Sequence, residues 1–212
     1  MPEPVKTRRY DATTRRRRAD ATRRRILRAA AALFAEHGYA GTAVSQVARR
    51  ARVSVDTVYA SVGRKPQLLL AVHDAVLGGG EPVPAEQRDY VRAVREAVGA
   101  RAKIAVYAEA LGRLLPGTVP IAEALRVAGQ TDADCRAVRA GLDERRARNM
   151  RLFAADLRAT GELRDDLTDD DVAELVWSMN SPEYYLVVTG RGATPEEYAG
   201  RVADVWTRTL LR

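Results

Sequence analysis

Apolar residues recur at three- and four-residue steps along almost the whole chain after residue 19, and no other feature of the sequence constrains the fold more. In the first such segment they are Ile26, Ala29, Ala30, Leu33 and Phe34. This spacing predicts an amphipathic helix, because an α-helix completes one turn in about 3.6 residues. No segment with the two-residue alternation of a β-strand extends beyond a few residues. The sequence therefore predicts an all-α protein.

One segment rich in glycine and proline, residues 78–84, interrupts the helical pattern and predicts a domain boundary. We therefore expect one helical domain over residues 20–77 and a second over residues 85–212. The second domain should contain helices near residues 85–98, 101–115, 119–129, 132–160, 169–189 and 195–211. Pro182 lies inside one of these runs, so we expect a kink or a break near Ser181. Residues 1–19 lack hydrophobic periodicity and carry a run of arginines, which is typical of a flexible basic arm.

The net charge divides at nearly the same place as the predicted domains. Residues 1–25 hold ten basic and three acidic side chains, and residues 26–80 hold six and three. Residues 81–212 hold 19 basic and 22 acidic side chains. The strongly basic N-terminal third suits a polyanionic partner such as nucleic acid. For the arm itself, entry into a DNA minor groove, nonspecific phosphate contact and a merely solvated tail remain open interpretations.

Composition and motifs exclude several classes of protein. The single cysteine, Cys135, cannot form an internal disulfide, and no run approaches the 18 apolar residues of a transmembrane helix. The basic N-terminus lacks the apolar region of a signal peptide, so we expect a cytoplasmic protein with no membrane partner. His37 and His73 both lie on predicted apolar helix faces. Because no catalytic triad, metal-ligand cluster or phosphate-binding loop is evident, we expect no catalytic residues, no cofactor and no metal.

Residues 44–61, VSQVARRARVSVDTVYAS, fit a helix-turn-helix. Ala48 is small where the second helix must approach the first, and Thr42 and Ser54 are placed to cap the two helices. Three further residues are spaced to seal the core between the helices: Val47, Val53 and Val58. Such a motif lays its second helix in the major groove of DNA, with its N-terminal residues toward the base edges.

A longer pattern surrounds this motif. It reads Ile26-x-x-Ala29-Ala30-x-x-Leu33-Phe34-x-x-x-Gly38-x-x-x-Thr42-x-Val44-x-x-Val47-Ala48, and it continues with Val53-Ser54-x-x-Thr57-Val58-Tyr59 and with Lys65 before Leu68-Leu69. In order and spacing this pattern, over about residues 22–76, resembles the DNA-binding domain of the tetracycline-repressor (TetR) family. Residues 181–211 also resemble the last two helices of many members. The resemblance implies a DNA-binding head followed by a helical ligand-binding and dimerisation domain.

The chain departs from the family pattern at three places. Arg52 stands in the turn where glycine is usual, which would cost about 1 kcal/mol if this residue adopts a left-handed conformation. Asp56 also stands where glycine is frequent, and Ala60-Ser61-Val62 replace a segment that commonly begins with His-Phe. None of these departures removes the motif, but they leave the operator sequence and the roles of positions 52, 56 and 60 open.

The resemblance implies roles for individual residues in DNA binding. Thr42, Tyr59 and Lys65 would contact phosphates, because helix N-termini present free amides to phosphate oxygens. Val55 would meet a thymine methyl group, and Asp56 would either accept from a cytosine amino group or only stabilise its own helix N-terminus. The full candidate set is Thr42, Arg52, Ser54, Val55, Asp56, Thr57, Tyr59 and Lys65. Arg49 and Arg50 either contact phosphates or form a solvated face.

The resemblance also assigns two sets of residues to the C-terminal domain. Candidates for a small-molecule pocket are Tyr107, Leu111, Met150, Phe153, Trp177, Asn180 and Tyr184, for which plain core packing is the alternative. Candidates for the contact between two subunits are Val172, Leu175, Val176, Met179, Tyr198, Val202, Val205 and Trp206. A two-fold homodimer would also match a palindromic DNA operator.

These features favour a dimeric transcriptional regulator that binds double-stranded DNA. We expect a repressor that a small-molecule effector releases from its operator. A DNA-binding regulator without a small-molecule ligand is one alternative. A helical interaction module whose basic arm binds polyanions nonspecifically is another.

Overall fold

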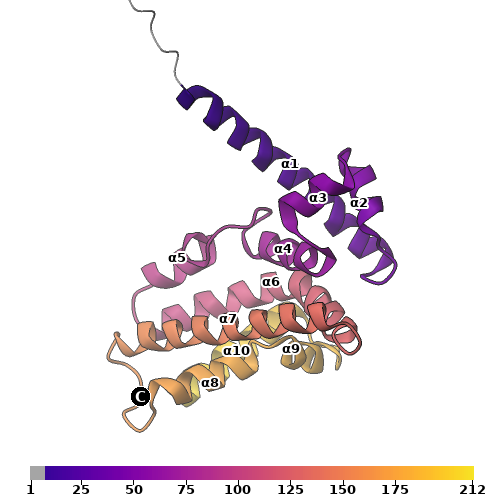
Figure 1. Cartoon of the computed structure of the whole chain (residues 1–212). Coiled ribbons are helices and arrows are strands. Elements are labelled where there is room, and N and C mark those ends of the chain that lie inside the picture. The colour runs from indigo at the N-terminus through magenta and orange to yellow at the C-terminus, as the bar shows by residue number, and fades with distance from the viewer. Residues whose placement is uncertain (1–7) are drawn as a thin grey trace, which may run out of the picture. The chain divides into compact units, whose positions relative to one another are not determined.

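The computed structural model describes the backbone of residues 8–212 and the side chains of residues 12–212 (Figure 1). The described chain forms ten α-helices and one short 3-10 helix, and its β-structure is a single bridge between Leu163 and Leu211. The helices are α1 Arg8–His37, α2 Val44–Ala51, α3 Val55–Val62, α4 Lys65–Leu77, η1 Ala85–Gln87, α5 Asp89–Glu96, α6 Ala100–Ala128, α7 Ala133–Arg158, α8 Asp169–Met179, α9 Pro182–Thr189 and α10 Pro195–Leu210. The expected all-α fold is confirmed.

The chain forms two compact units, and the division between them falls between Val72 and His73, inside α4. It does not fall at residues 78–84, where the loss of helical pattern predicted it. The reason is that the second half of α4 packs with later helices: Val76 lies against Gly117 of α6, and Asp74 accepts hydrogen bonds from Arg145 of α7. A break in secondary structure therefore does not coincide here with a break in packing.

The first unit contains α1, α2, α3 and the first half of α4, and five side chains form the centre of its core: Ile26, Val47, Val58, Leu68 and Leu69. The predicted irregular arm was wrong for residues 8–19, because they extend α1. Arginine and alanine favour helices, and no glycine or proline interrupts this stretch. Residues 1–7 of the predicted arm lie outside the described residues. His37 is exposed at the end of α1, not on an apolar face as predicted.

The second unit is built around α6, α7 and α10, with Trp206 and Tyr198 of α10 fully buried. Helix α6 was predicted as two helices but runs through Pro116 and Pro120 without a break. It approaches α10 closely at Gly112, where an added Cβ would lie 2.9 Å from the carbonyl oxygen of Pro195.

The predicted break near Ser181 is confirmed. Helix α8 ends at Met179, and Ser181 caps α9 by accepting a hydrogen bond from the backbone N–H of Tyr184. Pro182 occupies the first turn of α9, where no helical N–H partner is needed. The break therefore starts a new helix instead of bending an old one.

Most of the residues predicted to form the subunit contact were wrongly assigned, because they are buried within one chain. The buried members are Val172, Val176, Met179, Tyr198, Val202 and Trp206. The other two, Leu175 and Val205, are partly buried against the same core. An apolar stripe on a helix indicates burial but not what covers it, and here the chain's own helices cover it. The exposed apolar residues of α8 and α9 are instead Trp177, Leu186 and Val187.

The close approach at Gly112 predicts opposite effects for two Gly→Ala substitutions in helices. Nothing lies within 4 Å of a Cβ added at Gly141 of α7, so Gly141→Ala should raise the free energy of unfolding by about 0.5–1 kcal/mol. Gly112→Ala gains the same helix propensity but collides with backbone, and should lower the free energy of unfolding by about 1–3 kcal/mol. Urea unfolding followed by circular dichroism measures both values. Equal effects of the two substitutions would contradict the close helix contact.

Candidate DNA-binding surface and ligand cavity

Helices α2 and α3 and the turn between them form a helix-turn-helix. Ser54 caps α3, since its Oγ accepts a hydrogen bond from the backbone N–H of Thr57 at 3.1 Å. Arg52 has φ 54° and ψ 52°, and within the described residues no other non-glycine residue has a positive φ. The left-handed conformation that glycine usually provides in this turn is therefore adopted by an arginine, at a cost of about 1 kcal/mol.

The outer face of α3 is accessible. Asp56 is exposed, and Tyr59 is 47% exposed, which is unusual for a large aromatic side chain. Val55 and Thr57 are partly buried, while Val58 of the same helix is fully buried against α2. Arg52 and Ser54 are also exposed at the start of this face. The structure thus brings together the predicted DNA-facing residues from 52 to 59 on one short segment.

Thr42 is placed differently from the prediction. Its side chain is 2% exposed, and its Oγ1 donates toward the carbonyl oxygens of Leu33 at 3.0 Å and Gly38 at 2.8 Å. The N-cap of α2 is Ala43, whose N–H donates to Oε1 of Gln46 at 2.6 Å. The prediction that Thr42 caps this helix was therefore wrong. Its hydroxyl is bonded to the end of α1 and is not available to a phosphate.

The remaining cationic candidates differ in their partners. The ammonium of Lys65 lies 4.1 Å from the centre of the Tyr39 ring, which holds the start of α4 against the segment after α1. Arg50 pairs with Glu36 at 2.7 Å, and this hydrogen bond lowers the pKa of the Glu36 carboxyl. Arg49 is exposed next to it.

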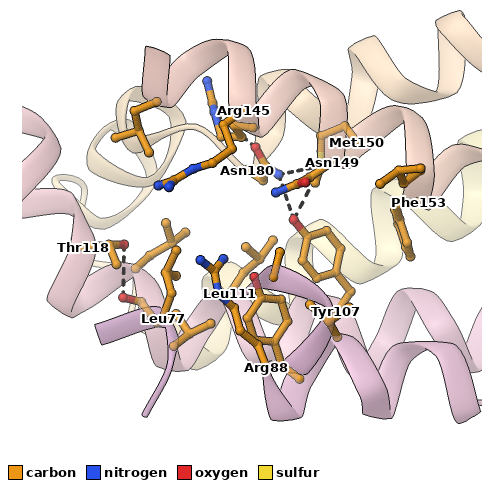
Figure 2. A pocket seen from close by; sticks show the side chains of 18 of the residues that line it. Leu77, Arg88, Tyr107, Leu111, Thr118, Arg145, Asn149, Met150, Phe153 and Asn180 are labelled. Atoms are coloured by element: carbon orange, nitrogen blue, oxygen red, sulfur yellow. Dashed lines mark hydrogen bonds between the residues drawn. The ribbon is translucent and has the colours of Figure 1, made fainter. Parts of the chain in front are cut away.

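The second unit encloses a cavity of about 460 Å³ (Figure 2). Its wall is formed by the end of α4, by η1 and α5, and by α6, α7 and the start of α9. Five residues predicted for a pocket line it: Tyr107, Leu111, Met150, Phe153 and Asn180. Two do not, because Trp177 lies under the guanidinium of Arg146 and Tyr184 packs against Tyr198.

A hydrogen-bonded group of three residues forms one side of the cavity. Asn180 Nδ2 donates to the hydroxyl of Tyr107 at 3.0 Å and toward Sδ of Met150 at 2.8 Å. Asn180 Oδ1 accepts a hydrogen bond from Arg146 at 2.9 Å. Burial raises the pKa of Tyr107 above its ordinary value, so this side chain remains a neutral phenol.

A charged group in the cavity wall was missed by sequence reasoning. Arg145 donates to both carboxylate oxygens of Asp74, at 3.0 and 2.6 Å, and Nδ1 of the buried His73 lies 3.4 Å from Oδ1 of Asp74. Burial alone would raise the pKa of Asp74, but hydrogen bonds from His73 and Arg145 outweigh it and the pKa falls to about 2. Arg88 is also buried here, with Nη2 3.9 Å from Asp74. No sequence signal distinguishes Arg88 or Arg145 in so arginine-rich a chain.

A helix-turn-helix with an accessible second helix, followed by a helical unit that encloses a cavity, defines a class of DNA-binding transcriptional regulators. Residues 26–72 match the family model described as bacterial regulatory proteins, tetR family. The match covers α2 and α3, the C-terminal part of α1 from Ile26 and the first part of α4 up to Val72. Residues 26–72 are thus a DNA-binding domain of the TetR family, and the whole chain shares the fold of solved TetR-family regulators.

Three solved structures illustrate the shared fold. TylP, a TetR regulator from Streptomyces fradiae, is 23% identical with a TM-score of 0.63, over 92% of this chain and 89% of that chain. The transcriptional regulator FadR from Bacillus subtilis in complex with stearoyl-CoA is 17% identical with a TM-score of 0.63, over 86% and 96%. NalD, the secondary repressor of the MexAB-OprM multidrug efflux pump in Pseudomonas aeruginosa, is 20% identical with a TM-score of 0.62, over 92% and 98%.

No curated protein matches the sequence. Within the described part of the chain, no helix is both long enough and apolar enough to cross a membrane.

The lowered pKa of Asp74 predicts how stability depends on pH. The carboxyl titrates near 3.8 when unfolded and near 2 when folded, so its ionised form stabilises the native state above about pH 4. This contribution to the free energy of unfolding, roughly 1–2 kcal/mol, is lost as the pH falls from about 4 to about 2. Asp74→Asn should therefore lower the free energy of unfolding at pH 6, and the difference from the unsubstituted protein should shrink toward pH 3.

Urea unfolding at a series of pH values checks this expectation. Asp204→Asn is the matched control, because Asp204 forms an exposed ion pair with Arg208 on α10 and should contribute little. A difference between Asp74→Asn and the unsubstituted protein that stays constant with pH would show that Asp74 does not contribute through its ionisation.

Proposed function

We propose that the protein is a dimeric repressor that a small molecule releases from DNA. In each subunit α3 lies in the major groove, with Val55, Asp56 and Thr57 near the bases and Tyr59 at a phosphate. The observation that carries the proposal is the continuity of α4. It begins in the helix-turn-helix unit, and its last turns supply His73 and Leu77 to the wall of the cavity.

This continuity gives a ligand a physical route to the DNA-binding unit. A ligand in the cavity contacts α4 directly and favours whichever position of α4 gives the better contacts. If that position differs from the one that fits DNA, occupation of the cavity lowers the affinity for the operator. The stearoyl-CoA complex of FadR and the repressor role of NalD support this proposal by analogy of fold.

A second copy of the chain is part of the proposal, because two reading helices must reach successive major grooves about 34–36 Å apart. The residues first predicted for the contact are buried, so we assign it to the exposed face of α9. Leu186 is 43% and Val187 is 65% exposed there, next to each other in sequence. Exposed apolar residues at neighbouring positions are typical of an interface core.

The proposed phosphate contact of Tyr59 can be tested by removing one oxygen atom. Tyr59→Phe should weaken binding to a palindromic duplex selected from a random library by about 3- to 10-fold, the value of a lost hydrogen bond. Because Tyr59 is exposed, helical content and the oligomeric state should not change. Fluorescence anisotropy at fixed salt measures the affinity.

A scrambled duplex of the same length is the control for this experiment. Equal binding of the unsubstituted protein to both duplexes would favour the alternative function, a module that binds polyanions without sequence preference. Loss of helical content in Tyr59→Phe would instead mean that Tyr59 belongs to the core.

The proposed dimer contact predicts a monomer after substitution on α9. Leu186→Glu combined with Val187→Glu should convert the dimer to a monomer in sedimentation velocity, since two charges would be placed in the interface. Both side chains are exposed in one chain, so the helical content should remain. Val98→Glu is the control, since Val98 is 91% exposed between α5 and α6. A double variant that remains dimeric would overturn this assignment.

A further inference from the structure

The buried guanidinium of Arg88 is the feature of the cavity that most needs an explanation. Arg88 is 5% exposed, and its Nε has no hydrogen-bond partner among the described residues. Burying a charged group without hydrogen bonds costs free energy, so native proteins seldom keep one without a use. Figure 2 shows the side chain extending into the open space of the cavity, with Arg145 on the opposite wall.

The nearest acidic group, Asp74, forms only a long ion pair with Arg88. Asp74 lies 3.9 Å from Nη2, beyond hydrogen-bond distance, and both of its oxygens already accept from Arg145, with His73 beside one of them. The hydrogen bonds of the Asp74 carboxylate therefore go to Arg145 of α7, and the guanidinium of Arg88 faces the cavity.

The other acidic residues of the wall have partners of their own or lie in solvent. Asp143 pairs with Arg139 at 3.4 Å and with Arg146 at 3.7 Å, and Asp156 pairs with Lys103 at 3.0 Å. Glu86 is exposed. Among the described residues, the buried guanidinium of Arg88 therefore has a long ion pair with Asp74 and an Nε without a hydrogen-bond partner.

The rest of the wall is suited to an apolar ligand body. Leu77, Leu111, Leu115 and Phe153 line it, and the volume of about 460 Å³ is that of a site for a small organic molecule. A single guanidinium binds a planar carboxylate through two parallel hydrogen bonds. The negative charge of Asp74 close to Arg88 disfavours a ligand of higher negative charge.

We propose that the cavity binds a small monocarboxylate with an apolar body, and that Arg88 holds its carboxylate group. This inference rests on the proposed role of the cavity as the effector site and names the class of effector. The apolar body lies among the leucines and Phe153, and the carboxylate satisfies the Nε that the protein leaves without a partner.

Isothermal titration calorimetry with matched probes tests the inference. n-Octanoate, n-decanoate and phenylbutyrate should bind, whereas the corresponding primary amides, which keep the shape and lose the charge, should bind at least about 10-fold more weakly. Arg88→Gln should lower the affinity for the carboxylates by about 10-fold or more and leave the affinity for the amides unchanged. Arg95→Gln is the matched control, since Arg95 lines the cavity but is exposed.

A measurement without ligand separates a binding role from a structural one. If Arg88 is kept for a ligand, Arg88→Met should raise the melting temperature of the ligand-free protein, because it removes a buried, unsatisfied charge. A lowered melting temperature would mean that the contact with Asp74 stabilises the fold, and it would overturn the proposal. Binding of no carboxylate in the series, or equal binding by Arg88→Gln, would also overturn it.

The DNA affinity distinguishes this inference from the proposed function. Carboxylates that bind through Arg88 without changing the affinity for the selected duplex would support the ligand class and contradict release by ligand. A neutral or cationic compound that releases the DNA, while carboxylates do not bind, would support release and overturn the ligand class.

Discussion

The carboxylate of Asp74, fixed by two hydrogen bonds from Arg145, is the interaction on which the organisation of this chain depends. It attaches the end of α4 to α7, and α4 is the same helix whose beginning completes the helix-turn-helix unit. An apolar contact in its place would allow neighbouring rotamers and small shifts, whereas a bidentate pair defines one geometry. The position of α4 in the second unit is therefore set by directional bonds.

The same interaction shapes the electrostatics of the cavity. Because Asp74 is bound by Arg145 and accompanied by His73, its pKa falls to about 2 and it remains ionised at any physiological pH. Nη2 of Arg88 lies 3.9 Å from Oδ1 of Asp74, which is beyond hydrogen-bond distance. Asn180 is hydrogen-bonded to Tyr107 and to Arg146 on one side of the cavity. On the other side, Nε of Arg88 has no hydrogen-bond partner among the described residues.

The features that could be predicted from the sequence are those that neighbouring residues determine, such as helix caps and helix breaks. Ser54 caps the helix that it was predicted to cap, and the break before Pro182 lies where proline requires it. The resemblance assigned Tyr198 and Trp206 to a contact with a partner subunit, whereas both are buried within one chain. The apolar wall and the Tyr107–Asn180 side of the cavity were predicted, but its charged side was not, because a buried arginine has no sequence signal that separates it from a solvated one.

Helix α6 forms one wall of the cavity, and its two prolines give that wall a particular mechanical character. Pro116 and Pro120 have no N–H, so the carbonyls of Gly112 and Pro116 lose their usual partners four residues on. Gly112 is held close to α10, which fixes the helix just before this stretch. Beyond it, Thr118 and Ala122 line the cavity on a segment with fewer hydrogen bonds to resist bending. Two missing hydrogen bonds after Gly112 therefore make this part of α6 easier to bend than the part that packs closely on α10.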